Sequence, residues 1–167
     1  MKTGEIIRLS GHLKGVNDVQ FSPDGQRLIS ASDDNSIIVW HLPSYQKVLR
    51  LVQHSACVIR AQFSLDGHSI ISCSNDKTIR LWDCSSGREI QKFAAHSRPI
   101  ADLQFSADCQ TAVSGSKDKT VRLWNLNSKL EMYKLEGHLD WVTGVDISPN
   151  GKIIVSSASD KTVRVWA

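Results

Sequence analysis

The chain lacks most features that would reveal a chemistry by themselves. Its 167 residues include four cysteines, which form no C-x-x-C pair and have no regular spacing, so a disulfide framework and a zinc site are both disfavoured. No apolar run reaches membrane-spanning length, and no charged-then-apolar signal segment is present. A P-loop and a dinucleotide fingerprint are also missing. These absences favour a soluble, cytoplasmic protein with reduced thiols and no cofactor.

The charge of the chain is mild and evenly spread. Twenty Lys and Arg against 17 Asp and Glu give a formal net charge of +3. Nucleic-acid-binding domains usually concentrate basic residues on one face. We therefore expect no nucleic acid and no membrane among the partners.

The most informative feature present is a period of 42 residues. Histidine, serine, aspartate and tryptophan each recur four times at this spacing. The four sets are His12, Ser30, Asp34 and Trp40; His54, Ser72, Asp76 and Trp82; His96, Ser114, Asp118 and Trp124; and His138, Ser156, Asp160 and Trp166. A fixed spacing of this size marks an array of units that bury their apolar faces only by stacking on one another.

Each repeat is predicted to contain four short strands separated by turns. In the first repeat, Asp24-Gly25 suits a hairpin turn whose glycine takes a positive φ. Cys109 occupies the same column in the third repeat, where a positive φ would add strain of about a kcal/mol. The expected repeat units are approximately 3–40, 41–82, 83–124 and 125–167, with residues 5–9 an outer strand that completes a C-terminal blade.

Two stretches carry a resemblance to a known family. Gly137-His138 before a first strand and the segment Ser-Asn-Asp-Lys-Thr-Ile-Arg-Leu-Trp-Asp from Ser74 to Asp83 resemble WD40 repeats. The resemblance covers essentially the whole chain and implies an all-β fold, a WD40 β-propeller with four four-stranded blades per chain. The pattern departs where Gln53 and Ala95 replace a glycine, and where His41, Asn125 and Ala167 replace an aspartate.

The recurring Ser, His and Asp invite a hydrolase interpretation, which the repetition argues against. A catalytic triad is needed once, yet the chain carries four complete sets and no G-x-S-x-G elbow. In WD40 proteins such a set implies a buried network, in which the aspartate binds the histidine, the histidine binds the serine and the serine binds the tryptophan indole. We therefore predict four structural tetrads, no enzyme activity and no metal site.

Four blades are too few to close a ring of this family. The sequence predicts a homodimer that forms an eight-bladed ring with two-fold symmetry, in which the N-terminal strand of each copy clasps the last blade of the other. The alternative is that these residues are a fragment of a longer natural propeller, for example the sensor region of a multidomain protein.

Propellers of this family imply an interaction platform, which makes a protein–protein interaction scaffold the favoured function. On the face that carries the histidine loops, the expected contacts to other proteins or peptides are Trp141, Lys14, Arg60, Arg98 and Lys117. Trp141 could equally fold over its own blade, and the basic residues could be merely solvated. The alternative function is a structural or engineered self-assembling propeller with no ligand of its own.

Overall fold

The computed structural model describes residue 4, residues 6–94 and residues 96–167, in which fifteen strands form four antiparallel sheets. We call each sheet with its loops a blade, numbered in chain order. Blade 1 contains β1 (Val16–Phe21), β2 (Arg27–Ser32), β3 (Ile37–His41) and β4 (Gln46–Leu51). Blade 2 contains β5 (Val58–Phe63), β6 (Ser69–Ser74), β7 (Ile79–Asp83) and β8 (Glu89–Phe93). Blade 3 contains β9 (Ile100–Phe105), β10 (Thr111–Ser116), β11 (Thr120–Asn125) and β12 (Leu130–Glu136). Blade 4 contains β13 (Val142–Ile147), β14 (Ile154–Ala158) and β15 (Val163–Trp166).

The all-β prediction of four blades is confirmed. Three blades have four strands in sequence order, and blade 4 has three among the described residues, its fourth strand being the one expected from residues 5–9. Residues 6–10 form no strand in the single chain, and Glu5 lies outside the described residues. The outer strand at 5–9 and the eight-bladed ring therefore stay predictions. No helix of the described part is long and apolar enough to cross a membrane.

The turns between the first and second strands have the predicted backbone. Gly25, Gly67 and Gly151 have φ values of 67°, 71° and 71°. Cys109, in the same column, has a φ of 57°. The condition for strain at Cys109 is therefore met, because a side chain in this region carries strain that glycine avoids.

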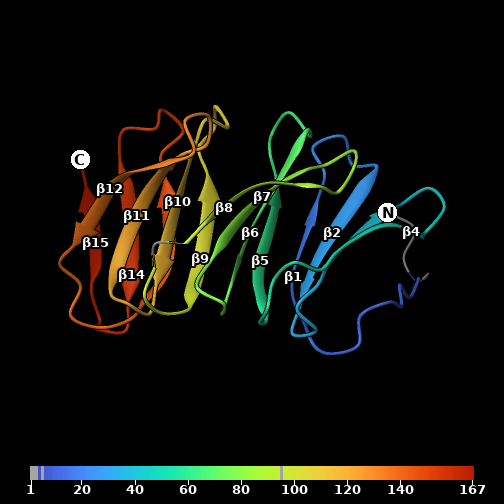
Figure 1. The fold of residues 1–167 in the computed structure, drawn as a ribbon, viewed down its shortest axis with the longest axis horizontal. Coiled ribbons are helices and arrows are strands. Elements are labelled where there is room, and N and C mark those ends of the chain that lie inside the picture. The colour runs from blue at the N-terminus through green and yellow to red at the C-terminus, as the bar shows by residue number, and fades with distance from the viewer. Residues whose placement is uncertain (1–3, 5, 95) are drawn as a thin grey trace.

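The blades stand side by side in a row, with blade 1 and blade 4 at opposite ends (Figure 1). The first strands of neighbouring blades lie next to each other along one side of the row. Apolar side chains fill each of the three interfaces between blades, in three separate clusters. The interface between blades 3 and 4 is tight at Gly115, where a Cβ atom would lie 2.6 Å from Val142 Cγ1. The core of this molecule therefore lies between its sheets.

A β-bulge in the first strand of blade 1 orients its apolar residues. The pairing of β1 with β2 shifts register between Val16 and Asp18, so Val16 and Val19 face one side although they are three residues apart. The pairings of β5 with β6 and of β13 with β14 shift at the equivalent place. In each of these blades, the bulge brings the apolar residues of the first strand to one side, which is the side that faces the preceding position in the row.

The two outward faces of the row are apolar and exposed. Val16 of β1 is 52% exposed, whereas its equivalent Val142 of β13 is 0% exposed. At the other end, Val163 of β15 is 72% exposed, whereas its equivalent Val121 of β11 is 0% exposed. We call Val16, Val19 and Phe21 the first end face, and Val155, Val163 and Val165 the last end face. Soluble proteins rarely leave contiguous apolar patches uncovered.

Candidate functional site

Each of the four predicted tetrads is hydrogen bonded in the structure. In blade 3, His96 Nδ1 lies 2.8 Å from Asp118 Oδ2, and His96 Nε2 lies 2.8 Å from Ser114 Oγ. The indole N–H of Trp124 donates to Ser114 Oγ at 2.8 Å. The other three blades repeat these contacts, with the same distances lying between 2.7 and 3.1 Å. Each tetrad therefore ties the loop before the first strand to the turn between the second and third strands.

The aspartate is the centre of each network. Asp118 accepts hydrogen bonds from the Ser97 backbone N–H, the Thr120 backbone N–H and the Thr120 hydroxyl. Burial opposes ionisation of Asp118, but the bonds from His96 and Thr120 outweigh it and hold the pKa of this carboxyl well below its ordinary value. The pKa values of Asp34, Asp76 and Asp160 are lowered in the same way. These groups are ionised acceptors at neutral pH.

The serines of the tetrads are poorly placed for nucleophilic attack. Ser72 and Ser114 are 0% exposed, and each hydroxyl is already engaged by a histidine and an indole. A nucleophile must reach its substrate, which buried hydroxyls cannot do. The described residues also include no group of three His, Cys, Asp or Glu side chains arranged to hold a metal ion.

Two of the predicted partner-binding residues lie together. Lys117 of blade 3 places its Nζ 4.9 Å from the centroid of the Trp141 ring of blade 4, which is cation–π distance. Trp141 remains 43% exposed. Next to it, Lys119 Nζ donates to the Leu139 carbonyl at 2.8 Å, and the Leu139 side chain is exposed. We call Trp141, Leu139, Lys117 and Lys119 the Trp141 patch.

The remaining basic residues divide between two places. Lys14 and Arg98 are exposed at equivalent positions of the loops before the first strands, at repeats other than that of Trp141. Arg60 lies on β5 and pairs with Asp102 of β9, with Asp18 of β1 at 3.9 Å. The structure therefore places Arg60 in a row of first strands, apart from the Trp141 patch.

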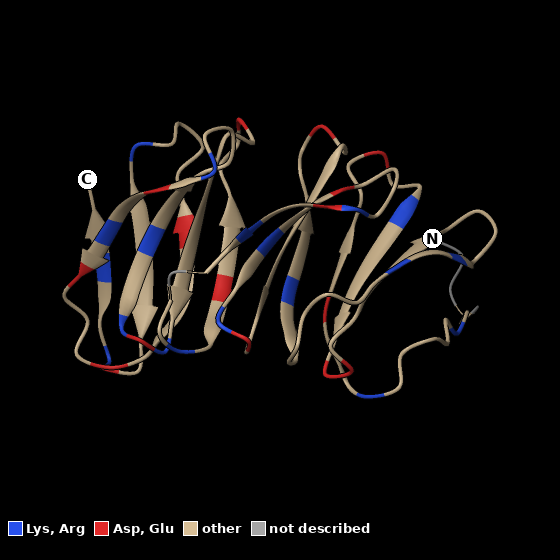
Figure 2. Cartoon of the chain, viewed as in Figure 1, with Lys and Arg blue, Asp and Glu red and all other residues tan. Residues whose placement is uncertain are grey.

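Two acidic residues, Asp18 and Asp102, belong to the same row and were not predicted from the sequence. Asp18 accepts a hydrogen bond from the Ala61 backbone N–H, and Asp102 accepts one from the Val145 backbone N–H, so each carboxylate reaches into the next blade. Asp18, Arg60 and Asp102 follow the same 42-residue spacing, and their alternating charge is the signal that could have revealed the contact. Figure 2 shows Lys and Arg interspersed with Asp and Glu along the strands and loops.

A family comparison accounts for these observations together. The sequence profile of the WD40 family, described as WD domain, G-beta repeat, matches residues 4–41, 45–83, 87–125 and 130–167. The chain belongs to the WD40 family. Repeats of this family are typical of protein-interaction scaffolds and are generally not enzymes.

Known relatives match this chain over about one repeat each. Ribosome assembly protein 4 of Saccharomyces cerevisiae is 58% identical over 38 residues, which is 23% of this chain and 7% of that protein. WD repeat-containing protein 36 of Homo sapiens is 53% identical over 45 residues, 26% of this chain and 5% of that protein. Apoptotic protease-activating factor 1 of Danio rerio is 61% identical over 31 residues, 19% of this chain and 2% of that protein. The matches thus span a small part of each relative.

Proposed function

We propose that the chain is a non-enzymatic protein–protein interaction scaffold that binds peptides on the face carrying the Trp141 patch. The observation that carries the proposal is the exposed Trp141 indole with the ammonium of Lys117 beside it. The tetrads serve as structural supports, because their polar atoms are occupied within each blade. Free thiols at all four cysteines fit a cytoplasmic location.

The patch favours a ligand with both apolar and acidic groups. The Trp141 ring and the Leu139 side chain offer apolar contact, while Lys117 and Lys119 supply positive charge within the same patch. Aromatic side chains with adjacent cations are common anchors in protein interfaces. An extended peptide with a large apolar residue next to Asp or Glu would complement these groups.

Panning a random peptide library on the protein tests this function. We expect the enriched peptides to combine acidic and apolar residues, and we expect Trp141→Ala to weaken their binding at least about tenfold. Leu13→Ala is the control, because Leu13 is an exposed apolar residue at the equivalent loop position of the first repeat, outside the patch. Peptides that bind Trp141→Ala and the unchanged protein equally would refute the role of the patch. Recovery of no peptide would favour the alternative, a self-assembling structural propeller with no ligand.

We also propose that two copies of the chain form an eight-bladed ring. Val155, Val163 and Val165 are the repeat equivalents of Ile29, Ile37 and Val39, which pack in blade 1 against blade 2. Val16, Val19 and Phe21 are the equivalents of Val58, Ala61 and Phe63, which form the other side of that contact. The first end face of one copy and the last end face of another thus match as neighbouring blades do.

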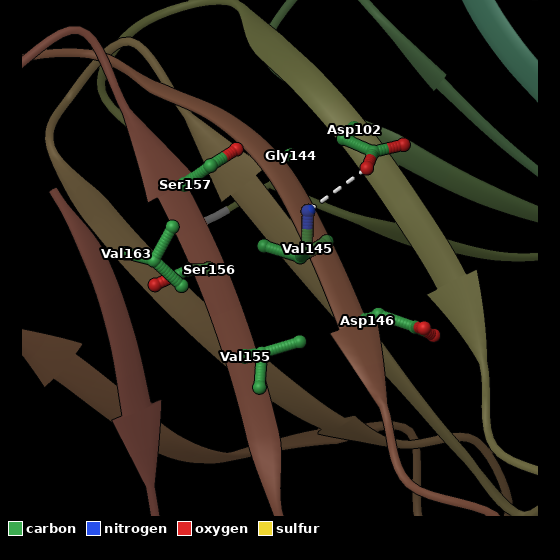
Figure 3. A pocket seen from close by; sticks show the side chains of 8 residues that line it. All are labelled: Asp102, Gly144, Val145, Asp146, Val155, Ser156, Ser157 and Val163. Carbon is green, nitrogen blue, oxygen red and sulfur yellow. Dashed lines mark hydrogen bonds between the residues drawn. The ribbon is translucent and has the colours of Figure 1, made fainter. Parts of the chain in front are cut away.

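The last end face is also hollowed where a further blade would pack. Val155 and Val163 lie on neighbouring strands β14 and β15 and line a hollow that extends to Gly144 and Asp102 (Figure 3). Asp102 lies at one wall of this hollow, where its carboxylate accepts a hydrogen bond of 2.9 Å from the Val145 backbone N–H. A first strand bearing branched and aromatic side chains fits such a surface, as β5 fits against blade 1.

The solution mass tests the ring. Light scattering should give twice the 18.5 kDa of one chain. A mass of one chain with cooperative unfolding would reject the ring, and it would leave the peptide-binding proposal standing, because the Trp141 patch lies within a single copy.

A further inference from the structure

All four blades contribute to one polar pocket on the side of the row formed by the first strands. Each first strand has a β-bulge, and the extra residue of each bulge lines the pocket. These residues are Asn17, Ile59, Ala101 and Thr143, and the lining is completed by Asp18, Arg60 and Asp102. The pocket has a volume of about 230 Å³. Bulges often redirect side chains beside functional sites, and these four bring one residue of each blade to the same place.

Two opposite charges in the pocket have hydrogen-bonding groups that no described residue uses. Arg60 donates through Nη1 to Asp102, whereas its Nη2 and Nε groups donate to no residue that the structure describes. Asp18 accepts the Ala61 N–H at Oδ2, and its Oδ1 accepts no hydrogen bond within the described part of the chain. The Arg60 and Asp18 side chains are 38% and 24% exposed, and Arg60 Nε lies 3.9 Å from Asp18 Oδ2. This distance is too long for a direct hydrogen bond.

Asp102 holds the Arg60 guanidinium in place while leaving most of its donors available. Asp102 Oδ1 accepts from Arg60 Nη1 and from the Leu103 N–H, and its Oδ2 accepts from the Val145 N–H. The Asp102 side chain is only 10% exposed. A guanidinium has five N–H donors in a planar fork, so several remain for a ligand. The pocket thus presents an oriented set of donors beside the carboxylate of Asp18.

The next row of side chains on the same strands is closed, and the difference indicates a ligand for the open one. Gln62 Nε2 donates to Gln104 at 2.6 Å, and the Gln62 side-chain oxygen accepts the Phe105 N–H. These amides join neighbouring blades, and Gln62 is only 6% exposed. A contact that only joins blades therefore needs no exposed charge. The unused groups of Asp18 and Arg60 are better explained by a molecule that binds between them.

We propose that this pocket binds a free α-amino acid, with the ligand carboxylate on the Arg60 guanidinium and the ligand ammonium on Asp18 Oδ1. An α-amino acid carries both charges on one carbon atom, which suits protein charges that are only 3.9 Å apart. A guanidinium fork binds a carboxylate through two parallel hydrogen bonds. An acid without an ammonium is repelled by Asp18 and Asp102, and an amine without a carboxylate is repelled by Arg60. A ligand with both charges satisfies both sides of the pocket.

The other lining residues define the rest of the ligand. Asn17 donates through Nδ2 to Asp33 and to the Val58 carbonyl, so its amide oxygen is available to accept a further hydrogen bond from the ligand ammonium. Ile59 and Ala101 add apolar surface to the lining. A volume of about 230 Å³ leaves little space beyond the two charged groups. We therefore expect the ligand to have a small apolar side chain, as alanine and valine do.

Isothermal titration calorimetry with L-alanine tests the site. L-Alanine carries both charged groups and only a methyl side chain, whereas propionate lacks its ammonium and ethylamine lacks its carboxylate. We expect L-alanine to bind with a dissociation constant of about 1 mM, and both analogues to bind at least about tenfold more weakly. Absence of saturable L-alanine binding, or equal binding of the three compounds, would overturn the proposal. This comparison uses the unchanged protein and needs no variant.

Asp18→Asn tests which residue binds the ammonium. The amide keeps the shape of the side chain but not its negative charge, so L-alanine should bind at least about tenfold more weakly while propionate binding should not fall. A loss of stability alone would not change this ratio between two ligands. Arg60→Lys should weaken L-alanine and propionate together, because an ammonium has no planar fork for a carboxylate.

Asp146→Asn is the matched control. Asp146 is also an exposed aspartate on a first strand, but it does not line this pocket, so its replacement should leave L-alanine binding unchanged. If Asp18→Asn keeps the preference for L-alanine over propionate, or if Asp146→Asn weakens L-alanine binding as much as Asp18→Asn does, the proposed site is wrong. Neither result bears on the proposed peptide binding, because the Trp141 patch shares no residue with the pocket.

Discussion

The interior of the row and its two ends are built from the same repeat, yet they differ sharply in burial. Ile37 and Val121 are each 0% exposed between two blades, whereas Val163, their equivalent, is 72% exposed. The difference is smaller in the tetrads: His54 and His138 are both buried, and His12 and Trp166 of the end blades are partly exposed. The comparison separates two kinds of stabilisation. Tetrads hold each blade from within, and apolar faces hold each blade to its neighbours.

Acid should produce the largest effect, because it acts on the tetrads of interior and end blades together. The tetrad carboxyls titrate near 3.8 when unfolded and at lower pH when folded, so the folded state binds fewer protons between these values. Their stabilisation is therefore present above about pH 4 and is lost as the pH falls further. Urea unfolding should be measured at a series of pH values from 7 to 3. The urea concentration at half-unfolding should begin to fall when the pH is below about 4. A flat profile would contradict this account of the tetrads.

Removal of one tetrad carboxylate should be the most damaging single change. Asp118→Ala removes the acceptor of His96, Thr120 and the Ser97 N–H, which leaves buried donors unsatisfied. The expected loss is about 3 kcal/mol of unfolding free energy, measured by urea denaturation. Asp146→Ala is the control, because Asp146 is exposed and accepts only the N–H of its neighbour Ile147. An equal loss of unfolding free energy in both variants would contradict the structural role of the tetrad.

Two valines at the same column allow the interior and an end to be compared directly. Val142→Ala should cost about 2 kcal/mol of unfolding free energy, because this buried side chain packs against Gly115. Val16→Ala should cost less than about 0.5 kcal/mol in the single chain, where the side chain faces solvent. The unfolding free energies should be measured by urea denaturation at a protein concentration low enough that the chains are monomeric. If the proposed ring forms, Val16→Ala should additionally weaken dimers, as seen in their dissociation constant.

The smallest effect concerns the turn of the third repeat. Cys109→Gly should stabilise by about 0.5 kcal/mol, because glycine accepts the φ of 57° without strain. The gain is limited by the loss of the contact from the Leu65 N–H to the Cys109 sulfur at 3.1 Å. The reverse change at the equivalent turn, Gly67→Cys, should destabilise by a similar amount. Differential scanning calorimetry of both variants resolves the two signs, and a loss of stability in Cys109→Gly would contradict the strain.

Local spacing predicted what depends on a single repeat. The tetrads could be found because four residue types recur at one step, and the strain at Cys109 followed from the glycine column it occupies. The residues whose location was not predicted make contacts between neighbouring blades. Arg60 was expected on the loop face with Lys14 and Arg98, but it lies on the first strand β5, where it pairs with the carboxylates of Asp18 and Asp102. The contact between Lys117 and Trp141 likewise joins two blades, and no spacing within one repeat indicates it.

The tetrads have a spectroscopic consequence. Each repeat contributes one indole N–H that donates to a serine oxygen, and Trp141 supplies a fifth indole near solvent. In a nitrogen–proton spectrum, the four bonded indole signals would exchange with deuterium only when their own blade opens. The molecule thus carries one natural reporter in each blade, and the order in which the signals fade would reveal which part of the array loosens first.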